Sequence, residues 1–125
     1  MPSRLDVICI VEDDAAVRGA LKFALEMEQM AVRDYDSPVS LLSDTNLPLF
    51  DCLVIDYRMP VMDGLELVAT LRERGVSAPV IVITDQADGH IRARAERLDI
   101  HHILEKPLAD GALMEAIRSA LRSIR

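Results

Sequence analysis

Three short runs of apolar residues restrict the fold of this chain more than any other feature of its sequence. The runs are Val7–Val11, Cys52–Ile55 and Val80–Ile83. Four or five consecutive apolar residues are typical of a strand that is buried on both faces, as in a parallel sheet covered by helices. The sequence therefore predicts three central strands, the first of them over residues 5–11.

Two weaker patterns predict further strands at the edges of the sheet. Residues 30–35 form a more polar run, and Ile103–Leu104 forms a very short one. Polar or short strands are typical of sheet edges. Five strands are therefore expected in total.

A helix is predicted after each of the five strands, because apolar residues recur there at helical spacing. Asp14 is well placed to cap the first helix, Ser37 and Pro38 start a short second one, and Asp63 and Gly64 precede the third. A fourth, arginine-rich helix is expected over about residues 89–98. The residues predicted to face inward are Val17, Leu21, Ala24 and Leu25 in the first helix, and Leu113, Ala116, Ile117, Ala120, Leu121 and Ile124 in the last.

Strand and helix thus alternate five times with short connections. This alternation predicts an α/β fold in which parallel strands are joined by right-handed crossovers and covered by helices on both faces. The chain has 125 residues, half of them hydrophobic, which is enough for one core. We therefore expect a single domain over residues 1–125.

Charge and hydropathy exclude two classes of partner. The formal net charge of -7 argues against a nucleic-acid-binding surface, which normally shows a basic stripe. The apolar runs are too short to cross a bilayer, and residues 1–4 lack the apolar core of a signal peptide. We therefore expect a cytoplasmic protein that binds neither nucleic acid nor membrane. Cys9 and Cys52 lie inside apolar runs, which predicts buried, reduced thiols.

Residues suited to phosphoryl or metal chemistry follow four of the five predicted strands. They are Glu12 and Asp13, Asp56, Thr84, and Lys106. Each one alone fits an ordinary strand end or turn. The carboxyl ends of parallel strands share one rim, however, and ligands of such sheets bind there. Together these residues therefore predict a functional site.

The chemistry expected at this rim is phosphoryl transfer. Clustered carboxylates repel one another and call for a compensating cation, and oxygen ligands with room for water suit Mg²⁺. Lys106 would add a positive charge, and Thr84 would add a hydroxyl donor. An aspartate beside a hard cation and a lysine can attack phosphorus, which makes Asp56 the candidate nucleophile.

At these positions the chain resembles the receiver domain of two-component response regulators, over essentially its whole length. The resemblance rests on Val11-Glu12-Asp13-Asp14, on Asp56-Tyr57-Arg58-Met59-Pro60 with the following Met62-Asp63-Gly64, on Ile83-Thr84, and on Lys106-Pro107. The chain looks most like the nitrogen-fixation-type receivers, which drive a helix-turn-helix domain. The resemblance implies a flavodoxin-like (βα)5 three-layer sandwich with strand order 2-1-3-4-5.

The resemblance also implies a function for the site. Asp56 would accept a phosphoryl group from a sensor histidine kinase, and Thr84 and Lys106 would move to bind it in a conformational switch. Such a domain is a phosphoacceptor rather than an enzyme, with at most slow self-dephosphorylation. Its Mg²⁺ ligands would be Asp13 and Asp56, Glu12 largely through water, and the backbone carbonyl of Arg58.

Two structural expectations come from the family as well. The Lys106-Pro107 peptide bond would be cis. The helix over residues 89–98, the strand at residues 103–104 and the last helix would form the signalling face. A homodimer or a contact with another partner is expected through this face.

Two positions depart from the family pattern. Ile103 stands three positions before Lys106, where receivers usually carry an aromatic residue that rotates on activation, so no ring can couple the switch here. Asp85 follows Thr84, where most receivers have a small residue. Its carboxylate could pair with Lys106 and repel a phosphodonor, or it could point into solvent.

These departures leave a second function open: a receiver-like interaction module that signals by protein binding without efficient phosphorylation. Two other classes fit the sequence less well. Aspartate-nucleophile phosphatases have a second aspartate two residues after the nucleophile, where this chain has Arg58. A flavodoxin would need a hydroxyl- and glycine-rich first turn for its cofactor phosphate, and the first turn here is acidic.

Overall fold

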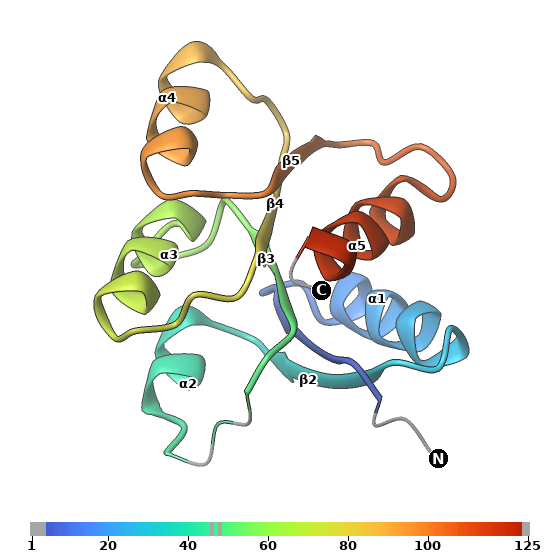
Figure 1. The fold of residues 1–125 in the computed structure, drawn as a ribbon. Coiled ribbons are helices and arrows are strands. Elements are labelled where there is room, and N and C mark those ends of the chain that lie inside the picture. The colour runs from blue at the N-terminus through green and yellow to red at the C-terminus, as the bar shows by residue number, and fades with distance from the viewer. Residues whose placement is uncertain (1–4, 46, 48, 124–125) are drawn as a thin grey trace.

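The computed structural model describes residues 5–45, 47 and 49–123 and shows a parallel sheet between two layers of helices (Figure 1). Its strands are β1 Val7–Val11, β2 Ala31–Tyr35, β3 Cys52–Asp56, β4 Val80–Thr84 and β5 His102–Glu105. They lie in the order β2-β1-β3-β4-β5, and each neighbouring pair is parallel. The predicted fold class and strand order are therefore confirmed.

Five helices cover the two faces of this sheet. They are α1 Ala15–Met27, α2 Pro38–Ser43, α3 Gly64–Glu73, α4 Gly89–Arg97 and α5 Ala112–Ser123. Figure 1 shows α2, α3 and α4 on one side of the sheet, and α1 and α5 on the other. None of the described helices combines the length and the apolar composition that crossing a bilayer would require.

The apolar side chains of the central strands divide between the two faces, as the pleat of a strand requires. On β1, Cys9 and Val11 join the cluster beneath α2, α3 and α4, whereas Ile8 and Ile10 join the cluster beneath α1 and α5. β3 and β4 are buried along their whole length, while β2 and β5 carry exposed residues. Central and edge strands are thus placed as predicted.

Local hydrogen bonds explain where three of the helices begin. Asp14 Oδ1 accepts two backbone N–H groups of the first turn of α1, at 2.9 and 3.1 Å. Ser37 caps α2, and Asp63 forms a capping box with Glu66 at the start of α3. Each contact satisfies amide donors that the first turn of a helix leaves unpaired. These starts agree with the sequence-based expectation.

The predicted inner face of α1 is partly wrong. Leu25 is buried and Leu21 is half-buried, but Val17 and Ala24 are exposed. α1 packs on β1 and on the edge strand β2. At the edge of a sheet a helix has less surface beneath it, so only a narrow stripe of α1 is covered.

The ends of the chain differ slightly from the prediction. The first strand begins at Val7, and Leu5 is 52% exposed. On α5, Ala116, Ile117, Ala120 and Leu121 are buried as predicted. Ile124, the last residue assigned to that stripe, lies outside the described residues.

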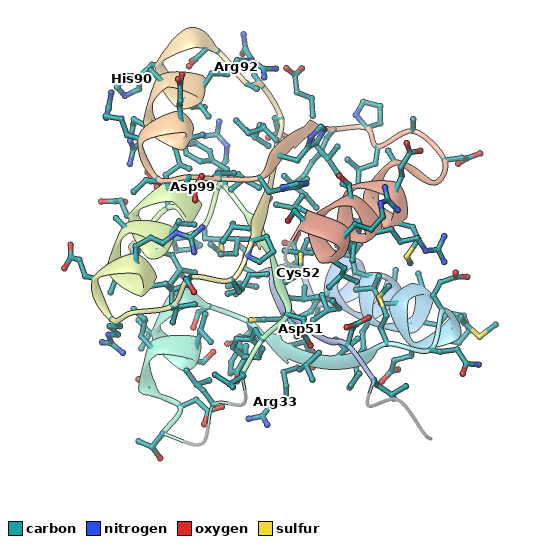
Figure 2. The ribbon with its side chains drawn as sticks, viewed as in Figure 1. Arg33, Asp51, Cys52, His90, Arg92 and Asp99 are labelled. Atoms are coloured by element: carbon teal, nitrogen blue, oxygen red, sulfur yellow. The ribbon has the colours of Figure 1, made fainter. Side chains whose placement is uncertain are left out.

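Both cysteines are buried and free, as predicted. Figure 2 shows Cys52 near the centre of the molecule. Burial raises the pKa of the Cys52 thiol to about 12, and it raises the pKa of the Cys9 thiol as well. Thiols that stay protonated are poor nucleophiles and poor metal ligands. Neither cysteine is therefore suited to a redox or metal role.

One side chain, Arg72, ties the ends of two helices together. Its guanidinium donates to the carbonyls of Val76 and Ala78 after α3, at 3.0 and 2.8 Å. It also donates to the carbonyls of Leu98 and Asp99 after α4, each at 3.1 Å; Asp99 marks this turn in Figure 2. The C-terminal end of α4 is therefore fixed to that of α3.

Replacement of Arg72 with methionine is expected to lower the free energy of unfolding by about 2 kcal/mol, because carbonyls that are partly buried lose their donor. Urea unfolding followed by circular dichroism measures the change. Arg74→Met is the matched control: Arg74 donates to the Leu42 carbonyl at an exposed position, and its loss should cost less than about 0.5 kcal/mol. Equal losses in the two variants would contradict the role of Arg72.

Candidate functional site

Backbone hydrogen bonds hold the carboxyl ends of the strands side by side. The N–H of Glu12 donates to the carbonyl of Tyr35 at 3.1 Å. The N–H of Tyr57 donates to the carbonyl of Ile83 at 2.8 Å, and the N–H of Lys106 donates to the carbonyl of Thr84 at 2.8 Å. Residues just after one strand are thereby fixed relative to those of the next. This rim brings together the predicted site residues Glu12, Asp13, Asp56, Thr84 and Lys106.

Three carboxylates meet at the rim. Glu12, Asp13 and Asp56 each offer an oxygen within 4.8 Å of the others. Glu12 and Asp56 are each only 5% exposed, whereas Asp13 is exposed to solvent. Carboxylates at this spacing repel one another, so a cation among them is favoured. An open, all-oxygen set of this kind fits Mg²⁺, which keeps several waters in its shell.

Asp56 is the carboxylate that also has a positive partner. Lys106 Nζ lies 3.1 Å from Asp56 Oδ1 in an ion pair. This oxygen is buried and accepts no hydrogen bond of good geometry from the described residues. Burial raises the pKa of Asp56; Lys106 opposes the rise, and Asp13 and Asp85 add to it. Burial lowers the pKa of Lys106, but the contact with Asp56 and the negative charges of Asp56, Glu12 and Asp85 together outweigh burial, so the net shift is upward.

Glu12 is oriented by the turn that follows β1. Its Oε2 accepts the N–H of Asp14 at 3.0 Å, and Arg18 donates to its backbone carbonyl at 2.8 Å. Burial raises the pKa of Glu12; the Asp14 hydrogen bond lowers it, and the charge of Asp56 raises it further. A carboxylate oriented by hydrogen bonds in this way is suited to hold a metal or its waters.

Thr84, at the end of β4, is 3% exposed, and its hydroxyl faces its own loop. Oγ1 lies 3.3 Å from the carbonyl oxygen of Gln86 and 3.3 Å from the amide nitrogen of the same residue. Both contacts of this hydroxyl are therefore made within its own loop. On the neighbouring strand, Ile103 is half-buried and packs against the cluster beneath α2, α3 and α4. The Lys106-Pro107 bond that follows is cis, as expected.

The start of α3 lies directly against the backbone of Asp56. A Cβ atom on Gly64 would stand 2.6 Å from the Asp56 carbonyl oxygen. The N–H of Gly64 donates to the Tyr57 carbonyl at 2.8 Å. Glycine is required here because no other residue allows this close approach of two backbones.

The loop before this glycine contains a strained turn. The N–H of Met62 donates to the Pro60 carbonyl at 2.8 Å, which closes a three-residue turn around Val61. Val61 has a φ of 73° and is 95% exposed. A positive φ is unfavourable for a β-branched residue. Val61 therefore stores backbone strain beside the site without packing against the core.

The structure decides between the two arrangements expected for Asp85. Its carboxylate does not pair with Lys106; Asp85 Oδ2 lies 3.7 Å from Arg58 Nε, and its side chain stays 59% exposed. The pair joins the loop after β3 to the loop after β4. Sequence reasoning gave Arg58 only a backbone role and missed its side chain. Opposite charges just beyond the ends of neighbouring strands were the signal for this contact.

Residues 8–118 match the protein family described as the response regulator receiver domain. This chain belongs to that family. The receiver is 40% identical over 122 residues to the transcriptional regulatory protein FixJ of Azorhizobium caulinodans, covering 97% of this chain and 57% of that protein. Its identity to the response regulator protein TodT of Pseudomonas putida is 34% over 122 residues, covering 98% of this chain and 54% of that protein.

A solved structure agrees with these relatives. The crystal structure of FixJ-N superimposes on the receiver with a TM-score of 0.84 at 32% identity, and the match covers 96% of each chain. The chain spans little more than half the length of the curated relatives named above. The shared part is the receiver fold.

Val61→Asn is expected to raise the free energy of unfolding of the receiver by about 0.5–1 kcal/mol, because asparagine tolerates a positive φ better than valine does. Thermal unfolding in Mg²⁺-free buffer measures the difference. Val61→Ile, which keeps the branched Cβ, serves as the control and should bring no gain. A melting temperature of the asparagine variant at or below that of the wild type would show that the turn is not strained.

Asp56→Asn is expected to stabilise the Mg²⁺-free receiver. The pKa of Asp56 is raised in the folded state, so its contribution to stability is full below the unfolded pKa of about 3.9 and is lost as the pH rises through the folded value. At pH 7 the variant should gain about 1 kcal/mol in the free energy of unfolding. The gain should shrink as the pH falls toward about 4.

Urea unfolding at several pH values follows this gain. Asp110→Asn is a suitable control, because it removes an exposed carboxylate after β5 and should change stability little at any pH. A gain that stays constant with pH would show that the ionisation of Asp56 is not its cause.

Proposed function

We propose that this receiver accepts a phosphoryl group on Asp56 and changes conformation in two-component signal transduction. The observation that supports this most is the setting of the Asp56 carboxylate. It is 5% exposed at the end of β3, has Lys106 at 3.1 Å, and shares the rim with two further carboxylates. Family membership supports the class of chemistry, and the roles of single residues are our inference.

Asp56 is the nucleophile in the proposed reaction. A carboxylate oxygen attacks the phosphorus of a phosphohistidine on a sensor histidine kinase. The new P–O bond forms as the P–N bond breaks, and the imidazole nitrogen leaves with the electron pair. The products are an acyl phosphate on Asp56 and a dephosphorylated histidine. The receiver is thus a phosphoacceptor, whose return to the free carboxylate by hydrolysis is slow.

Lys106 and the carboxylates supply positioning and charge, which dominate phosphoryl transfer. Glu12, Asp13, Asp56 and the backbone carbonyl of Arg58 would hold Mg²⁺. The fit rests on three carboxylate oxygens within 4.8 Å and on Asp56 Oδ1, a buried oxygen that accepts no hydrogen bond from the described residues. When bound, the cation neutralises charge on the phosphoryl oxygens.

Thr84 and Lys106 would bind the phosphoryl group once it is on Asp56. The Thr84 hydroxyl makes two contacts at 3.3 Å with Gln86, and these long contacts are easily exchanged for a phosphoryl oxygen. Rotation of the hydroxyl would change the contacts that hold the loop before α4. This would bias an existing equilibrium between two conformations. The neighbouring Ile103 is aliphatic, so the change would proceed without a rotating ring.

The partners are part of the same proposal. A sensor histidine kinase is the expected donor, and the reaction is expected in the cytoplasm. A homodimer through α4, β5 and α5 is carried over from the family. The polar character of α4, of which only Ile91 and Ala95 are buried, leaves most of this helix available for such a contact.

Incubation of the receiver with Mg²⁺ and a small acyl phosphate should add one phosphoryl group, because Asp56 is the best-placed nucleophile. Intact-mass spectrometry measures the gain. Chelation of Mg²⁺ or the change Asp13→Asn should slow it by at least about tenfold, since the cation loses a ligand. Hydroxylamine, which cleaves acyl phosphates, should remove the added mass.

Asp56→Asn and Asp63→Asn are the paired variants for this experiment. Asp63 caps α3 outside the carboxylate cluster, so its variant should still be phosphorylated. Absence of any gain in the wild type, or an equal gain in Asp56→Asn, would overturn the proposed function.

A further inference from the structure

One arginine of α1 reaches back to the acidic turn that follows β1. Nη1 of Arg18 donates to the backbone carbonyl of Glu12 at 2.8 Å. Nε of the same guanidinium lies 3.3 Å from Asp34 Oδ2 on β2, the strand next to β1. The side chain of Arg18 is only 19% exposed. Arg18 therefore joins the turn after β1, the first helix and the edge strand.

The carbonyl that Arg18 binds belongs to the peptide group between Glu12 and Asp13, two of the three clustered carboxylates. The next peptide group, between Asp13 and Asp14, is held as well, because the N–H of Asp14 donates to Glu12 Oε2 at 3.0 Å. Asp13 itself is exposed. Its orientation therefore depends on the peptide groups on either side of it rather than on packing, and Arg18 holds one of the two.

Lys22 offers a comparison on the same helix. Its Nζ lies 3.7 Å from Asp34 Oδ1, and its side chain is 40% exposed. Lys22 thus pairs with the same carboxylate as Arg18, but among the contacts of the described residues it makes none to Glu12. Fastening α1 to β2 requires only the pair with Asp34, and exposed ion pairs contribute little to stability. The contact with the Glu12 carbonyl is the additional feature of Arg18.

We propose that Arg18 is a positioning residue for the Mg²⁺ site. It holds the peptide group between Glu12 and Asp13, and thereby keeps their carboxylates within reach of one cation, while Asp34 holds the guanidinium in place. This inference rests on the proposed function, in which these carboxylates bind Mg²⁺. Groups that orient metal ligands without touching the metal raise its affinity, because the ligands are ordered before the cation binds.

The charge of Arg18 would act on the cation in the opposite direction. A guanidinium near the carboxylate cluster repels a divalent cation, so its removal would strengthen Mg²⁺ binding if charge were its only effect. Loss of positioning weakens Mg²⁺ binding instead. The sign of the change in affinity therefore separates a positioning role from a purely electrostatic one.

Titration of the receiver with magnesium chloride at constant ionic strength, followed by amide chemical shifts in NMR spectra, measures the dissociation constant for Mg²⁺. Arg18→Met should raise this constant about tenfold, because the peptide group between Glu12 and Asp13 loses its donor. Arg18→Gln is a second variant with the same expected direction, since its shorter side chain cannot replace both contacts. Thermal unfolding without Mg²⁺ confirms that each variant is folded at the temperature of the titration.

Lys22→Met is the matched control for the titration. It removes a positive charge and a pair with Asp34 from the same helix, but leaves the Glu12 carbonyl its donor. Its dissociation constant for Mg²⁺ should stay within about twofold of the wild-type value, because salt screens an exposed charge at this position.

The possible outcomes separate this inference from the proposed function. A wild type that binds Mg²⁺, beside an Arg18→Met variant whose dissociation constant is unchanged or lower, would overturn the role of Arg18 and leave the proposed function intact. An equal rise in Lys22→Met would overturn that role too, because loss of a pair with Asp34 would then explain the effect. Absence of Mg²⁺ binding by the wild type would overturn the proposed magnesium site and this inference with it.

Discussion

The site depends on an imbalance of charge at one end of the sheet. Three carboxylates within 4.8 Å share one lysine, and the central carboxylate is almost fully buried. This arrangement lowers the stability of the fold, because burial and mutual repulsion both disfavour ionised acids. The hydrogen-bonded ends of β1, β3, β4 and β5 hold the charges in place. The core therefore holds three carboxylates and a lysine at one end of the sheet, and the proposed phosphoryl transfer depends on this arrangement.

Most of this arrangement could be predicted from the sequence because it follows from backbone regularities. Apolar runs of strand length indicate the central strands, and Asp14, Ser37 and Asp63 indicate three helix starts. Once parallel strands are accepted, the residues after their carboxyl ends must share one rim. The sequence alone therefore predicts that Asp13, Asp56 and Lys106 lie close together. The strand order itself came from the family resemblance.

What could not be predicted are the directions of side chains, which depend on neighbours distant in sequence. Asp85 could have paired with Lys106, but it pairs instead with Arg58, which lies on the loop after β3. Val17 has the spacing of an inner residue, yet it is 41% exposed because α1 packs near the edge of the sheet. The Thr84 hydroxyl turns to Gln86 through a local contact that strand periodicity does not describe.

The hydrogen bonds of Arg72 hold the C-terminal end of α4 more firmly than the rest of the helix. Its C-terminal turn is fastened to α3 through the carbonyls of Leu98 and Asp99, whereas its middle is joined to the loop before α3 by the longer ion pair between Arg94 and Asp63, at 3.7 Å. Few apolar contacts add to these, because only two residues of α4 are buried, Ile91 and Ala95. Nearer its start, α4 is held by an exposed ion pair between Arg92 and Glu105 at 3.3 Å. A rearrangement at the rim would therefore meet less resistance from the start of α4 than from the turn after the helix, which Arg72 holds in place.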